Sequence, residues 1–332
     1  MDHVLSLMVF TTGIELEAGF AGRCELSTAA ETQINHSLRG TVASHWSTHS
    51  DSSAGHEIKS PILAEADDIF NQVPLVCHVM HEARLRIHGK CGLHVHVGFK
   101  PISQKDLSAK YRVMRLLSRH EDTFFKMLRP AGSRSNYCQR IPVTGWQSMS
   151  TGQGFEFWET SHTKYWWANA KALGSHGTIE FRLANGSLEP DYIIGLVSVL
   201  QCLFYAAVVS KEKVDWAKPA TNSDTELADA FMADIGTAKN TAFGQRAEIF
   251  IKRELGVAGA PPTAQYAEPP SATSYTPTVA PVEIPVPRRR QTRVMAAEVV
   301  ATASTAHELN AVQHFIRTAS DYTHNQDSNI IQ

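Results

Sequence analysis

The sequence has little of what marks several classes of protein. Its 332 residues carry a formal net charge of only −2, so no basic excess favours binding to nucleic acid. The five cysteines are an odd number without a C-x-x-C pair, which argues against a disulfide framework and fits a reducing compartment. The N-terminal stretch lacks the basic region and clear cleavage site of a signal peptide. We therefore expect a cytoplasmic protein without nucleic acid partners.

A single run, residues 191–210, is apolar over nearly the length that a membrane span requires. Ser198 and Gln201 interrupt this run, and Asp191 and a Lys-Glu-Lys sequence flank it. These polar residues favour a buried core helix, so we expect no association with a membrane.

The composition changes near residue 256, where Ala, Pro and Thr become dominant as far as Pro287. Such a segment buries too little apolar area to offset the entropy lost on ordering. We predict one domain over residues 1–255, a linker over 256–292, and a C-terminal helix with a disordered tail over 293–332.

The most informative stretch is Gly92–Gly98, in which Leu93, Val95 and Val97 alternate with polar or small residues. A period of two is typical of a strand with one buried face. The other face of this strand presents two imidazoles, His94 and His96, which a hydrophobic core does not need.

Three more stretches repeat this alternation, at residues 14–17, 57–61 and 178–183. If the four strands share one sheet, one face collects the charged and imidazole side chains of Glu15, Glu17, Glu57, Lys59, His94, His96, Glu180 and Arg182. Carboxylates at this density repel each other, and a divalent cation removes the conflict. Oxygen-rich sites with an occasional imidazole suit Mg²⁺ or Mn²⁺. Arg182 and Lys59 would then meet an anion such as phosphate.

The remaining patterns predict the elements around these strands. A first strand is expected over residues 8–20, and a loop with a short strand near Trp46 over residues 21–55. Helices are expected over 62–88 with a break at Pro74, over 103–128 with a capping box of Ser103 and Asp106, over 224–235 and over 238–254.

With these motifs in place, the sequence resembles the putative amidoligase family, which belongs to the carboxylate–amine ligases related to glutamine synthetase and glutamate–cysteine ligase. The resemblance covers about residues 8–210. Its motifs are Gly13–Glu17, Asp51–Ser53, Glu57–Pro61, Cys91–Gly98, Arg134–Cys138, Asn169 and Thr178–Arg182. Lys59 departs from the family pattern, which has an apolar residue there.

The resemblance implies an α+β fold with a curved antiparallel sheet, a partial barrel of about six strands with helices packed outside, like the catalytic domain of glutamine synthetase. It also implies the reaction. Such enzymes use Mg-ATP, or Mn²⁺ in place of Mg²⁺, to activate a carboxylate as an acyl phosphate, which an amine attacks to give an amide, ADP and phosphate. The partners would be a small-molecule or peptide acid and amine, whose identities stay open, as does the oligomeric state.

The resemblance further implies roles for single residues. Glu17 and Glu57 resemble ligands of one metal ion, and Glu15, His94 and Glu180 resemble ligands of a second. Arg182 resembles the arginine that contacts phosphate and, with Glu57 and Glu180, is a candidate catalytic residue. Lys59, Arg134, Arg140 and Asn169 are further candidates for contacts with nucleotide or substrate, and His96 and Asp51 are additional neighbours of the site.

Two other functions are compatible with the same residues. One is a hydrolase in which His94, His96 and a glutamate bind zinc around an activated water. Two points argue against this hydrolase: the carboxylates outnumber the imidazoles on the predicted face, and the mechanism gives Arg182 no role. The other is a non-catalytic descendant that only binds nucleotide, although the expected polar residues are all present.

Overall fold

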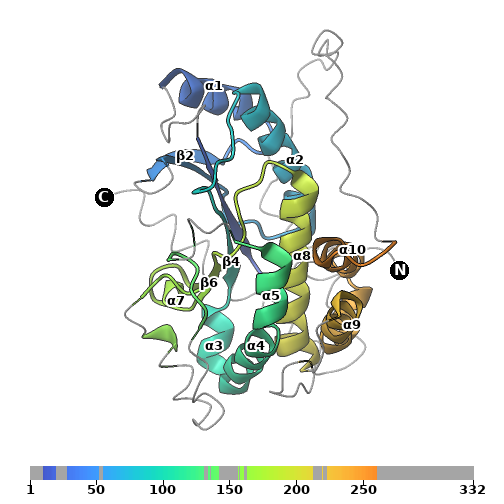
Figure 1. The fold of residues 1–332 in the computed structure, drawn as a ribbon. Coiled ribbons are helices and arrows are strands. Elements are labelled where there is room, and N and C mark those ends of the chain that lie inside the picture. Colours follow the sequence, from blue (N-terminus) through green and yellow to red (C-terminus); the bar gives the residue numbers. More distant parts are fainter. Residues whose placement is uncertain are drawn as a thin grey trace, which may run out of the picture. The chain divides into compact units, whose positions relative to one another are not determined.

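The computed structural model describes residues 10–19, 28–51, 55–130, 134, 136–141, 156, 158–160, 163–211, 219 and 223–259 (Figure 1). All of them belong to one compact unit, Met1–Ala267. The C-terminal helix and tail predicted over 293–332, and most of the linker predicted over 256–292, lie outside the described residues. The domain boundaries therefore stay predictions.

The centre of the unit is a six-stranded antiparallel sheet with strand order β2-β3-β1-β4-β6-β5. The α+β class and the antiparallel sheet are confirmed, while the likeness to glutamine synthetase stays a prediction. The sheet is open, with β2 and β5 at its edges. Its strands are β1 (Thr12–Ala18), β2 (Ser47–Asp51), β3 (Gly55–Lys59), β4 (Leu93–Gly98), β5 (Ala168–Asn169) and β6 (Thr178–Phe181).

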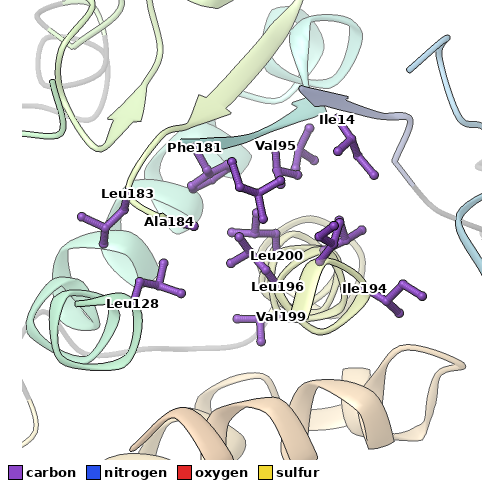
Figure 2. Close-up of a cluster of buried hydrophobic side chains, with 14 of the residues drawn as sticks. Ile14, Val95, Leu128, Phe181, Leu183, Ala184, Ile194, Leu196, Val199 and Leu200 are labelled. Carbon is purple, nitrogen blue, oxygen red and sulfur yellow. The ribbon is translucent and has the colours of Figure 1, made fainter. Parts of the chain in front are cut away.

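One face of the sheet is apolar because alternate residues of every central strand point to the same side. Figure 2 shows Ile14, Val95 and Phe181 extending from the strands towards Leu196 and Leu200. The two leucines belong to helix α8 (Pro190–Tyr205), which continues as a π-helical turn, η4 (Ala206–Ser210).

The continuous helix formed by α8 and η4, Pro190–Ser210, is long and apolar enough to cross a membrane by length and composition alone. However, 78% of its most apolar segment is buried inside the protein. On its other side it packs against helix α10 (Gly244–Leu255), which contacts α9 (Asp224–Asp234) and the short η5 (Gly236–Asn240). In Figure 1, α9 and α10 lie on one side of α8 and the strands on the other. This packing confirms the predicted core helix.

Two sequence-based expectations for the N-terminal half are wrong. Residues 21–55 contain the expected short strand near Trp46, which is β2, but the expected loop before it includes helix α1 (Thr28–Leu38). Ala30, Ile34 and Leu38 of this helix are buried at a helical spacing of four residues. Helix α2 (Ala66–Glu82) runs through Pro74 without the expected break. Its buried stripe, including Ile69, Val73 and Val76, lies on both sides of the proline and holds the helix against the core despite the missing hydrogen bond.

The helix expected over 103–128 is divided into α3 (Lys100–Lys105), α4 (Leu107–Arg119) and α5 (Glu121–Leu128). Asp106 is the N-cap of α4, and its carboxylate accepts a hydrogen bond from the Ala109 amide at 3.0 Å. The expected capping box with Ser103 is therefore wrong, because an Asp N-cap begins a new helix here. Another short helix, α7 (Ala172–His176), ends at Gly177 and leads into β6. Gly177 has a φ of 72°, a left-handed conformation that glycine adopts without strain.

Candidate functional site

The strand register brings the predicted polar residues together on the face opposite α8. Across β1 and β4, Glu15 pairs with His94. Across β1 and β3, Lys59 pairs with Glu15 and Glu57 pairs with Glu17. Across β4 and β6, His96 pairs with Glu180. Directly opposed residues share a face, so side chains from four strands converge there.

The centre of this polar face is a cluster of Glu15, His94 and Glu180. One ligand atom of each residue lies within 4.8 Å of the others. The His94 Nδ1 atom is 3.2 Å from Glu15 Oε2 and 3.5 Å from Glu180 Oε1, and its Nε2 atom is 3.5 Å from Glu17 Oε1. A single imidazole thus contacts three carboxylates.

His96 lies beside this cluster, and one of its two ring nitrogens makes no hydrogen bond in the described structure. Its Nδ1 atom hydrogen-bonds with Thr178 Oγ1 at 2.9 Å. Its Nε2 atom is buried, has no hydrogen-bond partner in the described structure, and lies 3.6 Å from Glu15 Oε1. Gly13 is the residue opposite His96 on β1, and a Cβ at Gly13 would be 3.4 Å from the His96 Cβ.

The surroundings keep two of the carboxylates ionised. Burial alone would raise the pKa of Glu15, but the hydrogen bond with His94 and the charges of His94 and His96 hold it well below its usual range. Burial would likewise raise the pKa of Glu180, but the charges of His94, Arg182 and His96 and a hydrogen bond from Asn169 lower it. Ionised carboxylates are the form that binds cations.

Two cationic side chains border the cluster. Lys59 Nζ is 3.2 Å from Glu15 Oε1 and 2.7 Å from Glu57 Oε1, and its side chain is 36% exposed. Burial would lower the pKa of Lys59, but the hydrogen bond to Glu57 and the charges of both glutamates raise it. On the other side, Arg182 Nη1 donates to Glu180 Oε1 at 2.5 Å.

Three residues fix the geometry around these charges. The Asn169 amide donates to Glu180 Oε2 at 2.8 Å, and its Oδ1 accepts from the backbone of Lys171. The Gly92 backbone N–H donates to Glu17 Oε2 at 2.6 Å, so one oxygen of Glu17 is engaged by the end of β4. Both glutamates are therefore held in place by donors from the fold.

Arg134 is at the site but is turned towards the backbone. It is buried, and its guanidinium donates to the carbonyl oxygens of Ala184 and Arg182. A Cβ at Gly92 would lie 2.7 Å from Arg134 Cζ, so only glycine leaves room for this guanidinium. Arg134 therefore supports the chain that carries Arg182, which differs from the ligand contact expected from the sequence.

Arg140, another predicted residue, is not brought into the cluster, and the side chain of Asp51 cannot be placed. Arg140 pairs with Glu121 and Asp122 and lies over the ring of Phe125. Asp51 ends β2, opposite Gly55, and its side chain lies outside the described ones. Thr178, which the sequence reasoning missed, contacts His96. Its place at the start of β6 was visible, but its contact with His96 depends on the pairing of β4 with β6.

The chemistry of this donor set fits a hard divalent cation. It is rich in carboxylate oxygen and has one imidazole at its centre, and His96 Nε2 adds a buried nitrogen without a hydrogen-bond partner among the described residues. Such a set suits Mg²⁺ or Mn²⁺ better than zinc, which favours nitrogen and sulfur ligands. The residues present therefore fit the metal ions that the family resemblance implies.

Comparison with known proteins agrees with this site. Residues 10–148 match the model of a family described as "putative amidoligase enzyme". A search of curated proteins finds no matching relative. The matched segment contains β1, β3 and β4 with Glu15, Glu17, Glu57, His94 and His96, whereas Glu180 and Arg182 lie beyond its end. Over residues 10–148, the chain is therefore similar to the putative amidoligase family.

Proposed function

We propose that the protein is an ATP- and Mg²⁺-dependent ligase that joins a carboxylate to an amine through an acyl phosphate. The observation that carries this proposal is the convergence of Glu15, His94 and Glu180 within 4.8 Å, with Arg182 directly beside them. The similarity of residues 10–148 to the putative amidoligase family supports amide-bond formation as the type of reaction.

In this reaction, an oxygen of the substrate carboxylate bonds to the γ-phosphorus of ATP while the bond to ADP breaks. The amine nitrogen then attacks the acyl carbon, phosphate leaves, and the nitrogen loses a proton. Phosphoryl transfer of this kind depends mainly on positioning and on neutralising charge. A bound divalent cation would supply neutralisation of the phosphate oxygens.

The chain's own residues would divide these tasks. Glu15, His94 and Glu180 would hold one cation, with Glu17 and Glu57 as candidates for another. Arg182 would bind the transferred phosphoryl group, since its guanidinium already lies at 2.5 Å from Glu180 and is partly exposed. Lys59, at the more open side of the cluster, would neutralise a second anionic group.

Thermal unfolding with Mg²⁺, ATP or both tests this function. A ligand that binds only the folded protein stabilises it by about 2.7 kcal/mol at one hundred times its Kd. We expect a rise of the midpoint that requires ATP and Mg²⁺ together. Glu15→Gln and Arg182→Ala should lose this rise and any phosphate release found with a panel of acids and amines.

The matched control is Glu248→Gln, which removes a carboxylate on α10 that pairs only with Lys252 among the described residues. It should respond to Mg-ATP as the natural protein does. A rise with Zn²⁺ alone and none with ATP would contradict the ligase and support a zinc hydrolase. A normal response to Mg-ATP in Glu15→Gln would contradict the assigned site.

A further inference from the structure

A polar cavity of about 470 Å³, with no residue of the carboxylate cluster in its lining, lies where three helices meet. The C-terminal ends of α5 and α10 and the first turn of α8 form three of its walls. The loop from β6 to α8 forms the fourth. The lining of the cavity includes Arg129, Asn185, Gly186, Tyr192, Arg253 and Glu254.

Hydrogen bonds fix the loop wall of this cavity. The Gly186 N–H donates to the carbonyl oxygen of Cys91 at 2.8 Å, and a Cβ at Gly186 would lie 2.8 Å from the Cys91 Cβ. The Asn185 amide donates to the carbonyl oxygen of Arg129 at 3.1 Å, which ties the loop to the end of α5. Because these hydrogen bonds already hold the loop, binding of a ligand does not cost the entropy of ordering it.

Arg253 is the residue that points to a ligand. Its side chain is only 11% exposed, and its Nε donates to Glu254 Oε1 at 2.8 Å. Its Nη2 is buried and has no hydrogen-bond partner among the described residues. A buried charged donor without a partner is costly, so natural proteins rarely keep one unless a ligand completes its bonds.

Arg129 and Tyr192 add two further donors. Arg129 ends α5 in the left-handed region with φ of 40°, a strained conformation that a glycine would adopt without cost. Its Nε donates to the carbonyl oxygen of Lys126, so the rest of its guanidinium makes no hydrogen bond in the described structure. Burial raises the pKa of Tyr192, whose hydroxyl therefore stays a neutral donor.

We propose that this cavity binds a small molecule by its oxyanion group, a carboxylate or a phosphate, held between the guanidinium groups of Arg253 and Arg129. Arginine offers two parallel donors that match such a group. Glu254 is the single carboxylate that lines the cavity in the described structure, and its Oε1 already accepts from Arg253. This site does not depend on the proposed ligase activity.

Binding of inorganic phosphate and of succinate to the full chain tests this inference, by calorimetry and by thermal unfolding, against sodium chloride at equal ionic strength. We expect at least one of the two anions to bind and to raise the unfolding midpoint. Binding of succinate alone would identify a carboxylate site, and binding of phosphate alone a phosphate site. Arg253→Gln and Arg129→Gln should each weaken binding about tenfold.

The matched control is Arg246→Gln, which removes an arginine of α10 that lies over the Phe70 ring, outside the cavity. It should bind both anions like the natural protein. Two results would overturn the inference: neither anion acting beyond sodium chloride, or unchanged binding in both cavity variants. Because Arg129 is exposed, its variant keeps the test valid if Arg253→Gln fails to fold.

Discussion

At the scale of single residues, the packing beneath the polar face depends on the absence of a side chain at Gly92. Because Gly92 has no side chain, the Arg134 guanidinium fits beside it and donates hydrogen bonds to the carbonyl oxygens of Arg182 and Ala184. The same position donates its N–H to Glu17. A change at this glycine therefore affects two sides of the site at once.

We expect Gly92→Ala to destabilise the protein by about 1–3 kcal/mol, because the new methyl group must displace a buried guanidinium. Urea unfolding measures this change. Gly174→Ala is the matched control, since a Cβ there meets nothing within 4 Å and α7 gains a better helix former. Equal stability of Gly92→Ala and the natural protein would contradict this prediction, because it would show that the Arg134 guanidinium can move aside without cost.

The residues of the polar face could be predicted because a period of two, once recognised, fixes the face on which each side chain lies. Glu15, His94 and Glu180 are examples. The individual contacts could not be predicted, because they depend on register. Arg140 shows a different limit: it lies in an irregular segment without periodicity, and two carboxylates of α5 attract it away from the sheet.

At the scale of elements, the junction of α4 and α5 is fastened to the end of α9. His120 lies at this junction, is fully buried, and contacts Asp234 Oδ2 through Nε2 at 2.7 Å. Arg119 pairs with the same carboxylate oxygen. The His120 Nδ1 atom has no partner in the described structure, so a proton there would be buried without a hydrogen bond.

This junction makes stability depend on pH. Burial lowers the pKa of His120, although Asp234 opposes the effect, so the unfolded chain takes up this proton first as the pH falls. Burial would raise the pKa of Asp234, but His120 and Arg119 lower it. Both groups therefore stabilise the fold above their unfolded pKa values, and stability is lost below about pH 6.5 for His120 and about pH 3.9 for Asp234.

We expect the free energy of unfolding to fall as the pH is lowered from neutral, and to fall less steeply in His120→Gln between about pH 6.5 and pH 5. Urea unfolding at a series of pH values gives both profiles. His78→Gln, which removes an exposed imidazole of α2, should keep the natural slope. The same slope in His120→Gln and in the natural protein would contradict the role of this junction.

The elements themselves could be predicted where their apolar pattern is long, as for α8, whose boundaries were nearly correct. The missed α1 has a stripe of three buried residues among its described side chains, in a segment rich in polar residues, so composition masked its periodicity. The division of 103–128 was missed because an aspartate three residues after a serine fits a capping box as well as a new N-cap.

At the scale of the whole molecule, the described residues build one continuous hydrophobic core. Its buried members run from Phe10 on the N-terminal side to Leu255 at the end of α10, with Val257 packed against them. Ala, Pro and Thr then dominate the composition. We therefore keep the proposal that residues 1–255 form the domain and that a linker follows.

We expect a chain that ends at Gly259 to unfold cooperatively, with a free energy of unfolding within about 0.5 kcal/mol of the full chain, since it keeps every core residue of the described part of the chain. Limited proteolysis of the full chain should first cut between about residues 256 and 292. A truncated chain that is insoluble or much less stable, or a first cut within residues 90–200, would contradict the domain boundary.

The strand order has one more consequence, for the time at which the polar cluster forms during folding. Glu15 and His94 are 79 positions apart in sequence, and His96 and Thr178 are 82 apart. Contacts at such separations form slowly, because the intervening chain loses conformational entropy before the strand pairing stabilises it. The cluster thus exists only in chains that have completed the centre of the sheet, so a partly folded chain would lack a preformed site for a cation.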